Sequence, residues 1–152
     1  CKKCNCHRQT FYYHYQDIYD LIADILLSER LDDFEQAKSI KDSSVRFLAY
    51  LKENFEFYRA TYLSSAKDLP DTFIYDKLRV KFLTILSKER KALDLKKIGE
   101  CRAAARRFSR IVSDEFGDCL KENNATPDKF EAKMKAYLEK AERNLFPSIL
   151  QM

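Results

Sequence analysis

Residues 8 to 21 of the 152-residue chain read Arg-Gln-Thr-Phe-Tyr-Tyr-His-Tyr-Gln-Asp-Ile-Tyr-Asp-Leu. Phe11 and Tyr15 are four positions apart, so on a helix they share one face and are predicted to form a buried stripe. The other side chains of this stretch that can hydrogen bond are Arg8, Gln9, Thr10, Tyr12, Tyr13 and His14. Arg and Gln can make bidentate contacts to base edges, and Tyr and His can bind phosphate oxygens. This face is therefore typical of a helix that contacts DNA.

The alternative is that the aromatic residues of this stretch form an ordinary core cluster. A buried helix does not carry Arg, Gln, Thr and His on consecutive turns unless each has a partner. This argument favours a solvent-facing polar surface. The aromatic residues concerned are Phe11, Tyr12, Tyr13, Tyr15 and Tyr19.

The residues before this stretch extend the pattern. Lys2 and Lys3 are interpreted as the end of one helix, and Asn5-Cys6-His7 as the tight turn into the next, which is helix-turn-helix spacing. With residues 10–15, Thr-Phe-Tyr-Tyr-His-Tyr, the segment from Cys6 to Leu21 resembles the recognition half of the TetR family of bacterial transcriptional regulators. The resemblance implies that Arg8, Gln9 and Thr10 face the major groove and that Tyr12, Tyr13 and His14 contact the backbone. The sequence of this recognition segment is also similar to that of a TetR subgroup that includes regulators of dihydroxyacetone kinase genes.

Three positions depart from the family pattern. Gln16 and Ile18 stand where lysines are usual, and each lost cation should flatten the salt dependence of binding by about one counterion. His7 stands where a small capping hydroxyl is usual. Because a TetR-like head has two helices before its recognition helix, the chain, which begins at Cys1, is expected to be the remainder of a longer protein with an incomplete head.

The composition indicates an all-α protein, because the chain holds only 2 Gly and 3 Pro and is rich in strong helix formers. The net charge of +4 is too small to indicate a polyanionic partner by itself. The charge is unevenly distributed, since residues 77–110 hold twelve Lys or Arg against Glu89, Asp94 and Glu100. Such a run is either a solvated face or an anion-binding, DNA-flanking surface.

Five cysteines, an odd number, and the lack of a signal peptide or a long apolar run predict a reduced cytoplasmic protein without a membrane span. A closed zinc site needs a second, paired set of ligands, and Cys101 and Cys119 lie far along the chain. We therefore expect no metal and no cofactor, and interpret the cysteines as small hydrophobes. The residues with zinc-ligand chemistry near the start are Cys1, Cys4, Cys6 and His7.

The sequence also argues against an enzyme. It contains no Gly-rich phosphate loop, no paired metal motif and no nucleophile elbow, and its only histidines are His7 and His14. Without a set of residues that could act as acid, base or nucleophile, no reaction is expected.

The chain is predicted to divide into residues 1–27, the remainder of the head with a connecting helix capped by Asp17, and residues 28–152, a regulatory and dimerisation body. Residues 28–44 are the expected hinge, with a short helix near 34–40. In the body, helical spacing and capping residues predict a helix from Ser43 or Ser44, with a possible break near Asn54, and further helices from Asp68-Leu69-Pro70, over about 93–122, and from Thr126-Pro127.

Two surfaces of the body follow from the resemblance. Its middle helices would hold a small ligand among Phe47, Phe55, Tyr58, Tyr62 and Phe82, although core packing explains the same residues. Its last two helices would pair with those of a second subunit, with the alternative that their stripes pack within one chain. The predicted dimer residues are Phe108, Val112, Phe116, Leu120, Phe130, Met134, Tyr137 and Leu138.

The sequence thus predicts a homodimeric, TetR-like DNA-binding regulator, a repressor by the commoner behaviour of that family. A complete head would bind double-stranded operator DNA, and a small effector in the body would control it. The alternative is a helical interaction module or co-regulator that does not itself bind DNA.

Overall fold

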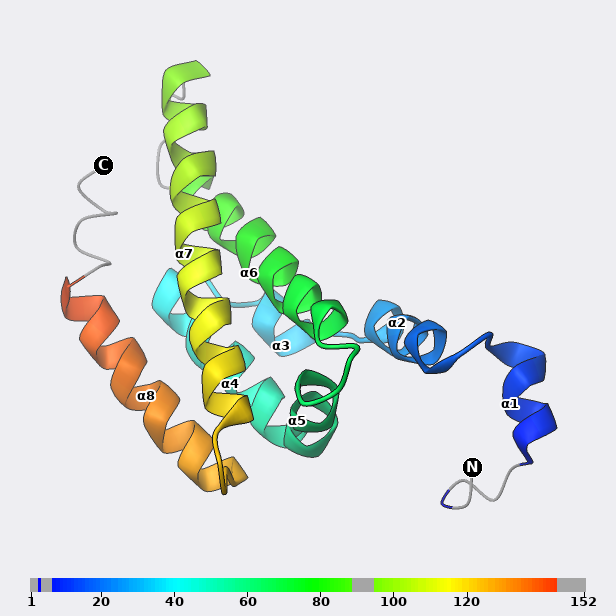
Figure 1. Cartoon of the computed structure of the whole chain (residues 1–152). Coiled ribbons are helices and arrows are strands. Elements are labelled where there is room, and N and C mark those ends of the chain that lie inside the picture. Colours follow the sequence, from blue (N-terminus) through cyan, green and yellow to red (C-terminus); the bar gives the residue numbers. More distant parts are fainter. Residues whose placement is uncertain (1–2, 4–6, 89–94, 145–152) are drawn as a thin grey trace. The chain divides into compact units, whose positions relative to one another are not determined.

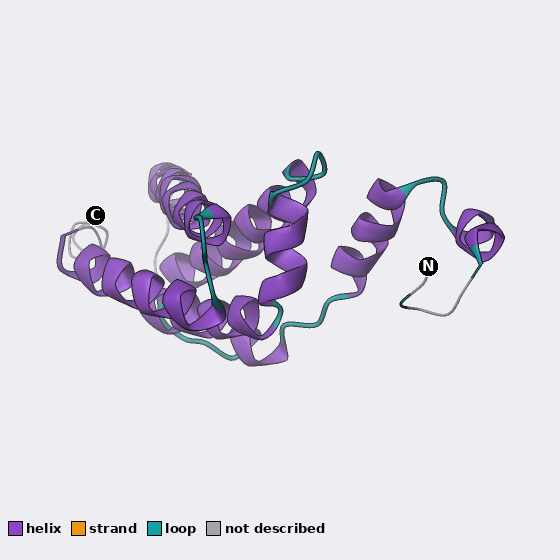
Figure 2. Ribbon diagram, turned by 60° about the horizontal axis from the view of Figure 1, so that its bottom comes forward, coloured by secondary structure: helices purple, strands orange, loops and turns teal. Residues whose placement is uncertain are grey.

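The computed structural model describes residues 3, 7–88 and 95–144, and every regular element in this part is a helix (Figures 1 and 2). The chain divides into two units, residues 1–30 and 31–152. None of the described helices is long and apolar enough to cross a membrane.

The first unit holds α1 (Arg8–His14) and α2 (Ile18–Ser28). The second holds α3 (Asp32–Glu35), α4 (Ile40–Glu53), α5 (Phe55–Tyr62), α6 (Asp68–Lys88), α7 (Leu95–Lys121) and α8 (Pro127–Asn144).

The first long helix of the second unit, α4, begins earlier than predicted. Ser39, and not Ser43 or Ser44, is its N-cap, and the Ser39 hydroxyl accepts a hydrogen bond from the Asp42 backbone N–H at 3.0 Å. Ser43 and Ser44 are buried inside the helix, where both hydroxyls donate to the Ile40 carbonyl oxygen, at 2.9 and 2.8 Å. Bonding to the preceding turn allows serine to stay within a helix, so the serine pair is no start signal here.

The breaks in the middle of the chain lie where the sequence predicts them. α4 and α5 are separated at Asn54, whose side-chain amide donates to the Tyr50 carbonyl oxygen at 2.9 Å. α6 begins at Asp68 and has Pro70 in its first turn, where an amide proton has no helical partner to lose. Of the two alternatives, one long helix or two with a break near Asn54, the structure has the second, and the predicted start of α6 is confirmed.

The longest helix, α7, packs closely against α5 at Gly117. A Cβ atom at this position would lie 3.1 Å from the Cε1 atom of Tyr62, which is tighter than an ordinary contact. The absence of a side chain at Gly117 therefore lets the Tyr62 ring approach α7 closely. α7 spans Leu95–Lys121 and so ends one residue before the predicted end at about 122, while residues 93 and 94 lie outside the described part of the chain.

The connection from α7 to α8 is short, and the two helices run in opposite directions (Figure 1). Asn124 takes a left-handed conformation with φ of 58°, which Asn tolerates better than most residues. Thr126 then caps α8 by accepting a hydrogen bond from the Lys129 backbone N–H at 3.2 Å. The Arg59 guanidinium donates to the carbonyl oxygens of Leu120 and Glu122, at 2.6 and 2.8 Å, and so satisfies acceptors at the end of α7.

The core of the second unit is a chain of phenylalanine rings that joins five helices. Phe34 of α3 meets Phe47 of α4 with ring centroids 5.1 Å apart, and Phe47 meets Phe116 of α7 at 5.9 Å. Phe116 is 6.3 Å from Phe130 of α8, which lies 5.8 Å from Phe55 of α5. All five side chains are buried. One aromatic residue from each helix therefore fixes how the helices pack.

Cys101 and Cys119 are free thiols inside this core, which fits their interpretation as small hydrophobes. Burial, aided by the nearby Glu115 carboxylate, raises the pKa of the Cys119 thiol to about 12. Because only the thiolate is alkylated, iodoacetamide should modify Cys119 about a thousandfold more slowly than an unfolded cysteine peptide at pH ~8. Mass spectrometry of the peptide that contains Cys119 measures the rate, and the same reaction in urea is the control. Equal rates with and without urea would contradict this packing.

Candidate nucleic-acid interface

Helix α1 presents all of the predicted DNA-contacting side chains to solvent. It contains no buried residue, and the exposed fractions of Tyr12 and Tyr13 are 66% and 85%. A core aromatic cluster, the alternative, therefore does not describe these two residues. The exposed set is Arg8, Gln9, Thr10, Tyr12, Tyr13 and His14, all in two consecutive turns.

The predicted buried stripe of α1 is only partly formed. Phe11 and Tyr15 are both half-buried, with ring centroids 5.8 Å apart. The reason is that α1 ends at His14, and Tyr15 is its C-cap with an extended backbone. The spacing that would align Phe11 and Tyr15 on one helical face is therefore not kept.

A hydrogen bond from the C-cap residue ties α1 to α2. The Tyr15 hydroxyl donates to Oδ2 of Asp24 at 2.8 Å, and this bond raises the pKa of Tyr15. The Gln16 backbone N–H donates to Oδ2 of Asp20 at 3.2 Å. The Asp20 backbone N–H in turn donates to Oδ1 of Asp17 at 3.0 Å, which confirms Asp17 as the N-cap of α2. The carboxylates of Asp20 and Asp24 thus tie the end of α1 and the following residue to α2.

The N-terminal end of α1 has no side-chain cap. His7 is its N-cap residue, but the side chain of His7 makes no capping hydrogen bond. This matches the departure from the family pattern seen in the sequence. In α2, Ile22 and Leu26 are buried as the helical spacing predicts, whereas Ile18 is 52% exposed.

The side chains of this face are rich in hydrogen-bonding groups and poor in positive charge. Arg8 is the only Lys or Arg within α1, so a single guanidinium supplies the positive charge. Arg8 and Gln9 are adjacent and exposed, and both have side chains suited to bidentate contacts with purines. The phenols of Tyr12 and Tyr13 and the imidazole of His14 add donors for phosphate oxygens.

The residues predicted to line a ligand pocket lie in the core. Phe47, Phe55, Tyr58, Tyr62 and Phe82 are each at most 4% exposed, and they pack against neighbouring helices. The Tyr58 hydroxyl is 2.6 Å from that of Tyr50, so this pair satisfies itself. These contacts support core packing, the alternative explanation of the same residues.

The residues predicted to form a dimer interface are also buried within one chain. Phe116, Leu120 and Met134 have no exposed surface, Phe108 is 8% exposed, and Tyr137 alone is half-buried. The other buried members are Val112, Phe130 and Leu138. Apart from Tyr137, these side chains are thus buried within one chain, which favours the alternative that the stripes pack within one chain. The homodimer and its interface stay predictions.

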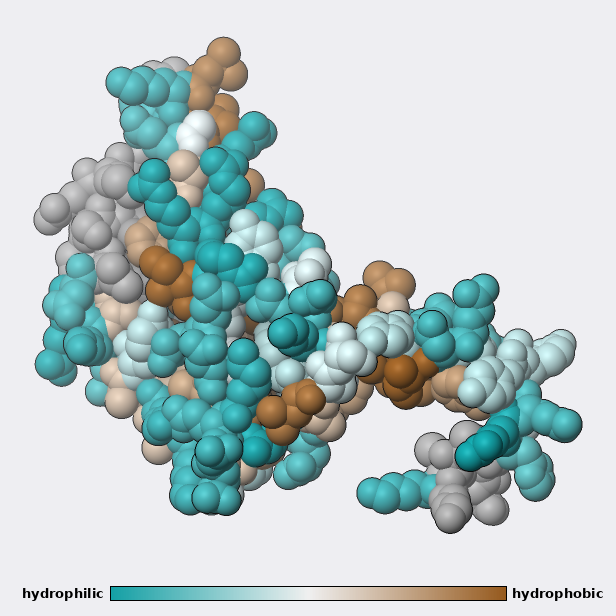
Figure 3. Space-filling view, viewed as in Figure 1, coloured by the Kyte–Doolittle hydropathy of each residue, from teal (hydrophilic) through white to brown (hydrophobic). Residues whose placement is uncertain are grey.

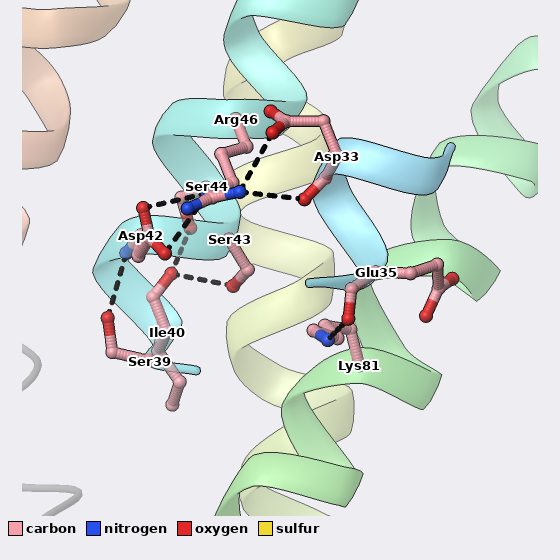
Figure 4. A network of polar contacts seen from close by, with 9 residues as sticks. All are labelled: Asp33, Glu35, Ser39, Ile40, Asp42, Ser43, Ser44, Arg46 and Lys81. Carbon is pink, nitrogen blue, oxygen red and sulfur yellow. Dashed lines mark hydrogen bonds and ion pairs between the residues drawn. The ribbon is translucent and has the colours of Figure 1, made fainter. Parts of the chain in front are cut away.

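A polar network that the sequence does not indicate holds α3 against the body (Figure 4). The Arg46 guanidinium of α4 binds the carboxylates of Asp33, at 2.8 Å, and Asp42, at 3.1 Å. The Lys81 ammonium of α6, 9% exposed, donates to the Glu35 carbonyl oxygen at 2.5 Å and lies 6.0 Å from the centroid of the Phe34 ring. The helix α3 that this network holds spans Asp32–Glu35, whereas the sequence predicts a short helix near 34–40.

A signal for Lys81 does exist in the sequence. It lies three residues after Leu78 and four before Ile85, on the apolar stripe of α6. A lysine inside such a stripe has its ammonium group near the core and needs an acceptor there. The acceptor, a backbone carbonyl, carries no sequence signature.

Part of the predicted head lies outside the described residues, namely Lys2 and the turn residues Asn5 and Cys6, together with Cys1 and Cys4 of the zinc pattern. In the part that the structure describes, no group of three or more His, Cys, Asp or Glu side chains could hold a metal ion. Comparison of the chain with known protein families, curated proteins and solved structures gives no match.

Proposed function

We propose that the protein is a DNA-binding transcriptional regulator that reads duplex DNA with the exposed face of α1. One observation carries the proposal. Six side chains that can contact bases or phosphates are exposed on two turns of α1, and the helix itself is anchored through Tyr15 and Asp24. A helix that exposes two tyrosines has not been stabilised by burial, so a binding partner best accounts for that surface.

Each side chain has a distinct role in this proposal. Arg8 and Gln9, beside Thr10, read base edges in the major groove, and Arg8 makes the strongest of these contacts. Tyr12, Tyr13 and His14 bind the phosphate backbone and fix the register. With one cation in the helix, phosphate attraction contributes little affinity, and discrimination among sequences rests on Arg8.

Regulation is proposed by resemblance to the TetR family. Two copies of the chain would place two α1 helices on half-sites about one DNA turn apart, and a small effector would shift the population of binding-competent protein.

The test is a pair of substitutions in α1. Arg8→Ala should reduce discrimination between a preferred duplex and a scrambled duplex by about 1–3 kcal/mol, because a bidentate base contact is lost. Tyr12→Phe should weaken binding to both duplexes alike, since a phosphate contact carries no sequence information. Fluorescence anisotropy with the two duplexes measures both effects.

Arg8→Lys is the matched control, since it keeps the charge and loses the planar fork. It should retain the salt dependence of binding and lose the discrimination. If all three variants bind both duplexes like the original chain, α1 does not enter the groove.

A second function is favoured by exposed apolar residues in the first unit. Leu27 is 87% exposed, Ile18 52% and Tyr19 40%, and aromatic and large apolar side chains anchor protein interfaces. A helical interaction module would use them to bind another protein. Variants of Arg8 and Tyr12 that leave DNA binding unchanged would favour this function.

A further inference from the structure

The N-terminal half of α7 carries a group of exposed cations that folding does not explain. Its members are Lys96, Arg102, Arg106 and Arg107, all exposed to solvent. Within the described part of the chain, none of the four forms an ion pair. Arg102 and Arg106 are four residues apart, a spacing at which like charges destabilise a helix.

The C-terminal half of the same helix is different. Arg110 binds the carboxylates of Asp71 on α6 and Asp114, each at 2.8 Å, and its guanidinium lies 4.8 Å from the centroid of the Tyr75 ring. Lys121 is 3.6 Å from Asp118. Within the described residues, Arg110 and Lys121 therefore have carboxylate partners, whereas Lys96, Arg102, Arg106 and Arg107 form no ion pair.

The surface around the four cations is open. A Cβ atom at Gly99 would meet nothing within 4 Å, and Arg107 borders a hollow shared with Glu100, Ala103 and Ala104. Small residues between the cations leave room for an extended polyanion to lie along the helix. The viewed face of α7 is mainly hydrophilic (Figure 3), with Leu95 the exposed apolar residue among the cations.

We propose that Lys96, Arg102, Arg106 and Arg107 form a second nucleic-acid contact, which binds the phosphate backbone of duplex DNA irrespective of sequence. Three of the four are arginines, whose forked donors match phosphate oxygens. Single strands are bound through aromatic stacking, and no exposed aromatic residue lies on α7 in the described structure. A membrane-surface helix needs a wide exposed apolar face, whereas the apolar face of α7 is buried in the core.

This contact is independent of the proposed role of α1, because it requires neither base recognition nor any arrangement of the two units. The two proposals therefore fail separately. Loss of the α7 cations changes affinity for all duplexes, whereas loss of Arg8 changes the preference among them.

The experiment compares two triple variants of the 152-residue chain. Arg102→Gln, Arg106→Gln and Arg107→Gln together remove the α7 arginines. The control replaces Lys67, Lys140 and Arg143, exposed cations without ion pairs in the described structure, by Gln. Each set lowers the net charge from +4 to +1. Binding to a mixed-sequence duplex is measured between about 50 and 200 mM salt, with anionic phosphatidylserine vesicles as a separate probe.

The α7 variant should lose at least about tenfold in duplex affinity, and its dependence of log affinity on log salt should flatten by about 2–3. The control should change neither quantity to that extent. Equal effects of the two sets would overturn the proposal, because net charge alone would then account for binding. Absence of duplex binding by the original chain, or binding to vesicles and not to duplex, would also overturn it. Circular dichroism checks that both variants keep their helices.

Discussion

Replacing Phe116 with Ala is expected to lower the free energy of unfolding of the second unit by about 3–5 kcal/mol. Phe116 has no exposed surface, and its ring is in contact with Phe47 of α4 and Phe130 of α8. Removing the ring deletes the middle of the aromatic chain that joins these helices. The surrounding helices cannot close the space, because each is held by other contacts along its length. Urea unfolding followed by circular dichroism measures the loss.

Ile111→Ala on the same helix is the control. Ile111 is 39% exposed, so its truncation should cost less than about 1 kcal/mol. A loss for Phe116→Ala no larger than that for Ile111→Ala would contradict the packing of α4, α7 and α8 described above.

The second large effect is expected from Lys81→Glu, which should also cost about 3–5 kcal/mol. The new carboxylate would lie in a buried position and face the Glu35 carbonyl oxygen and the Phe34 ring, where the lysine ammonium now lies. An unpaired charge of the wrong sign is added, and the hydrogen bond that holds α3 is lost. Thermal and urea unfolding both report this change.

Two further variants separate charge from packing. Lys88→Glu reverses an exposed charge on the same helix and should cost less than about 1 kcal/mol. Lys81→Met keeps the apolar stem and should cost about 1–2 kcal/mol, the value of a lost buried hydrogen bond. If Lys81→Glu proves as mild as Lys88→Glu, Lys81 is not buried against α3.

The elements of the fold that the sequence predicts well are those with a local physical cause. Asn54, Asp68 and Thr126 each mark a break, a start or a cap that needs only neighbouring residues to be recognised. The start of α4 was misplaced because Ser39, Ser43 and Ser44 can all cap a helix. Only tertiary packing, which buries Ser43 and Ser44, distinguishes among them.

In the candidate site, too, the sequence predicts features with a local cause and misses those that depend on tertiary contacts. The polar face of α1 could be predicted, because hydrogen-bonding side chains without local partners imply exposure. The bond between Tyr15 and Asp24 could not, since it depends on the end of α1 at His14 and on an extended Tyr15. The partner of Lys81 is a backbone carbonyl, which any residue could supply.

The buried stripes of α7 and α8 illustrate a limit of periodicity. An apolar stripe at helical spacing shows that a face is covered, and it does not show whether the same chain or a second subunit covers it. For Phe116, Leu120 and Met134 the cover is α4 and its neighbours in one chain. The same reasoning applies to Phe47 and Tyr58, whose side chains are packed in the core and do not line a ligand cavity.

The most direct test of the central claim is selection of duplex DNA by the purified protein from a random-sequence library. If α1 reads bases, the selected duplexes share a short motif, and the Arg8→Ala protein enriches that motif less or not at all. A pool that shows no motif beyond that of a selection without protein, or an identical motif from the Arg8→Ala protein, would contradict the claim that α1 recognises DNA.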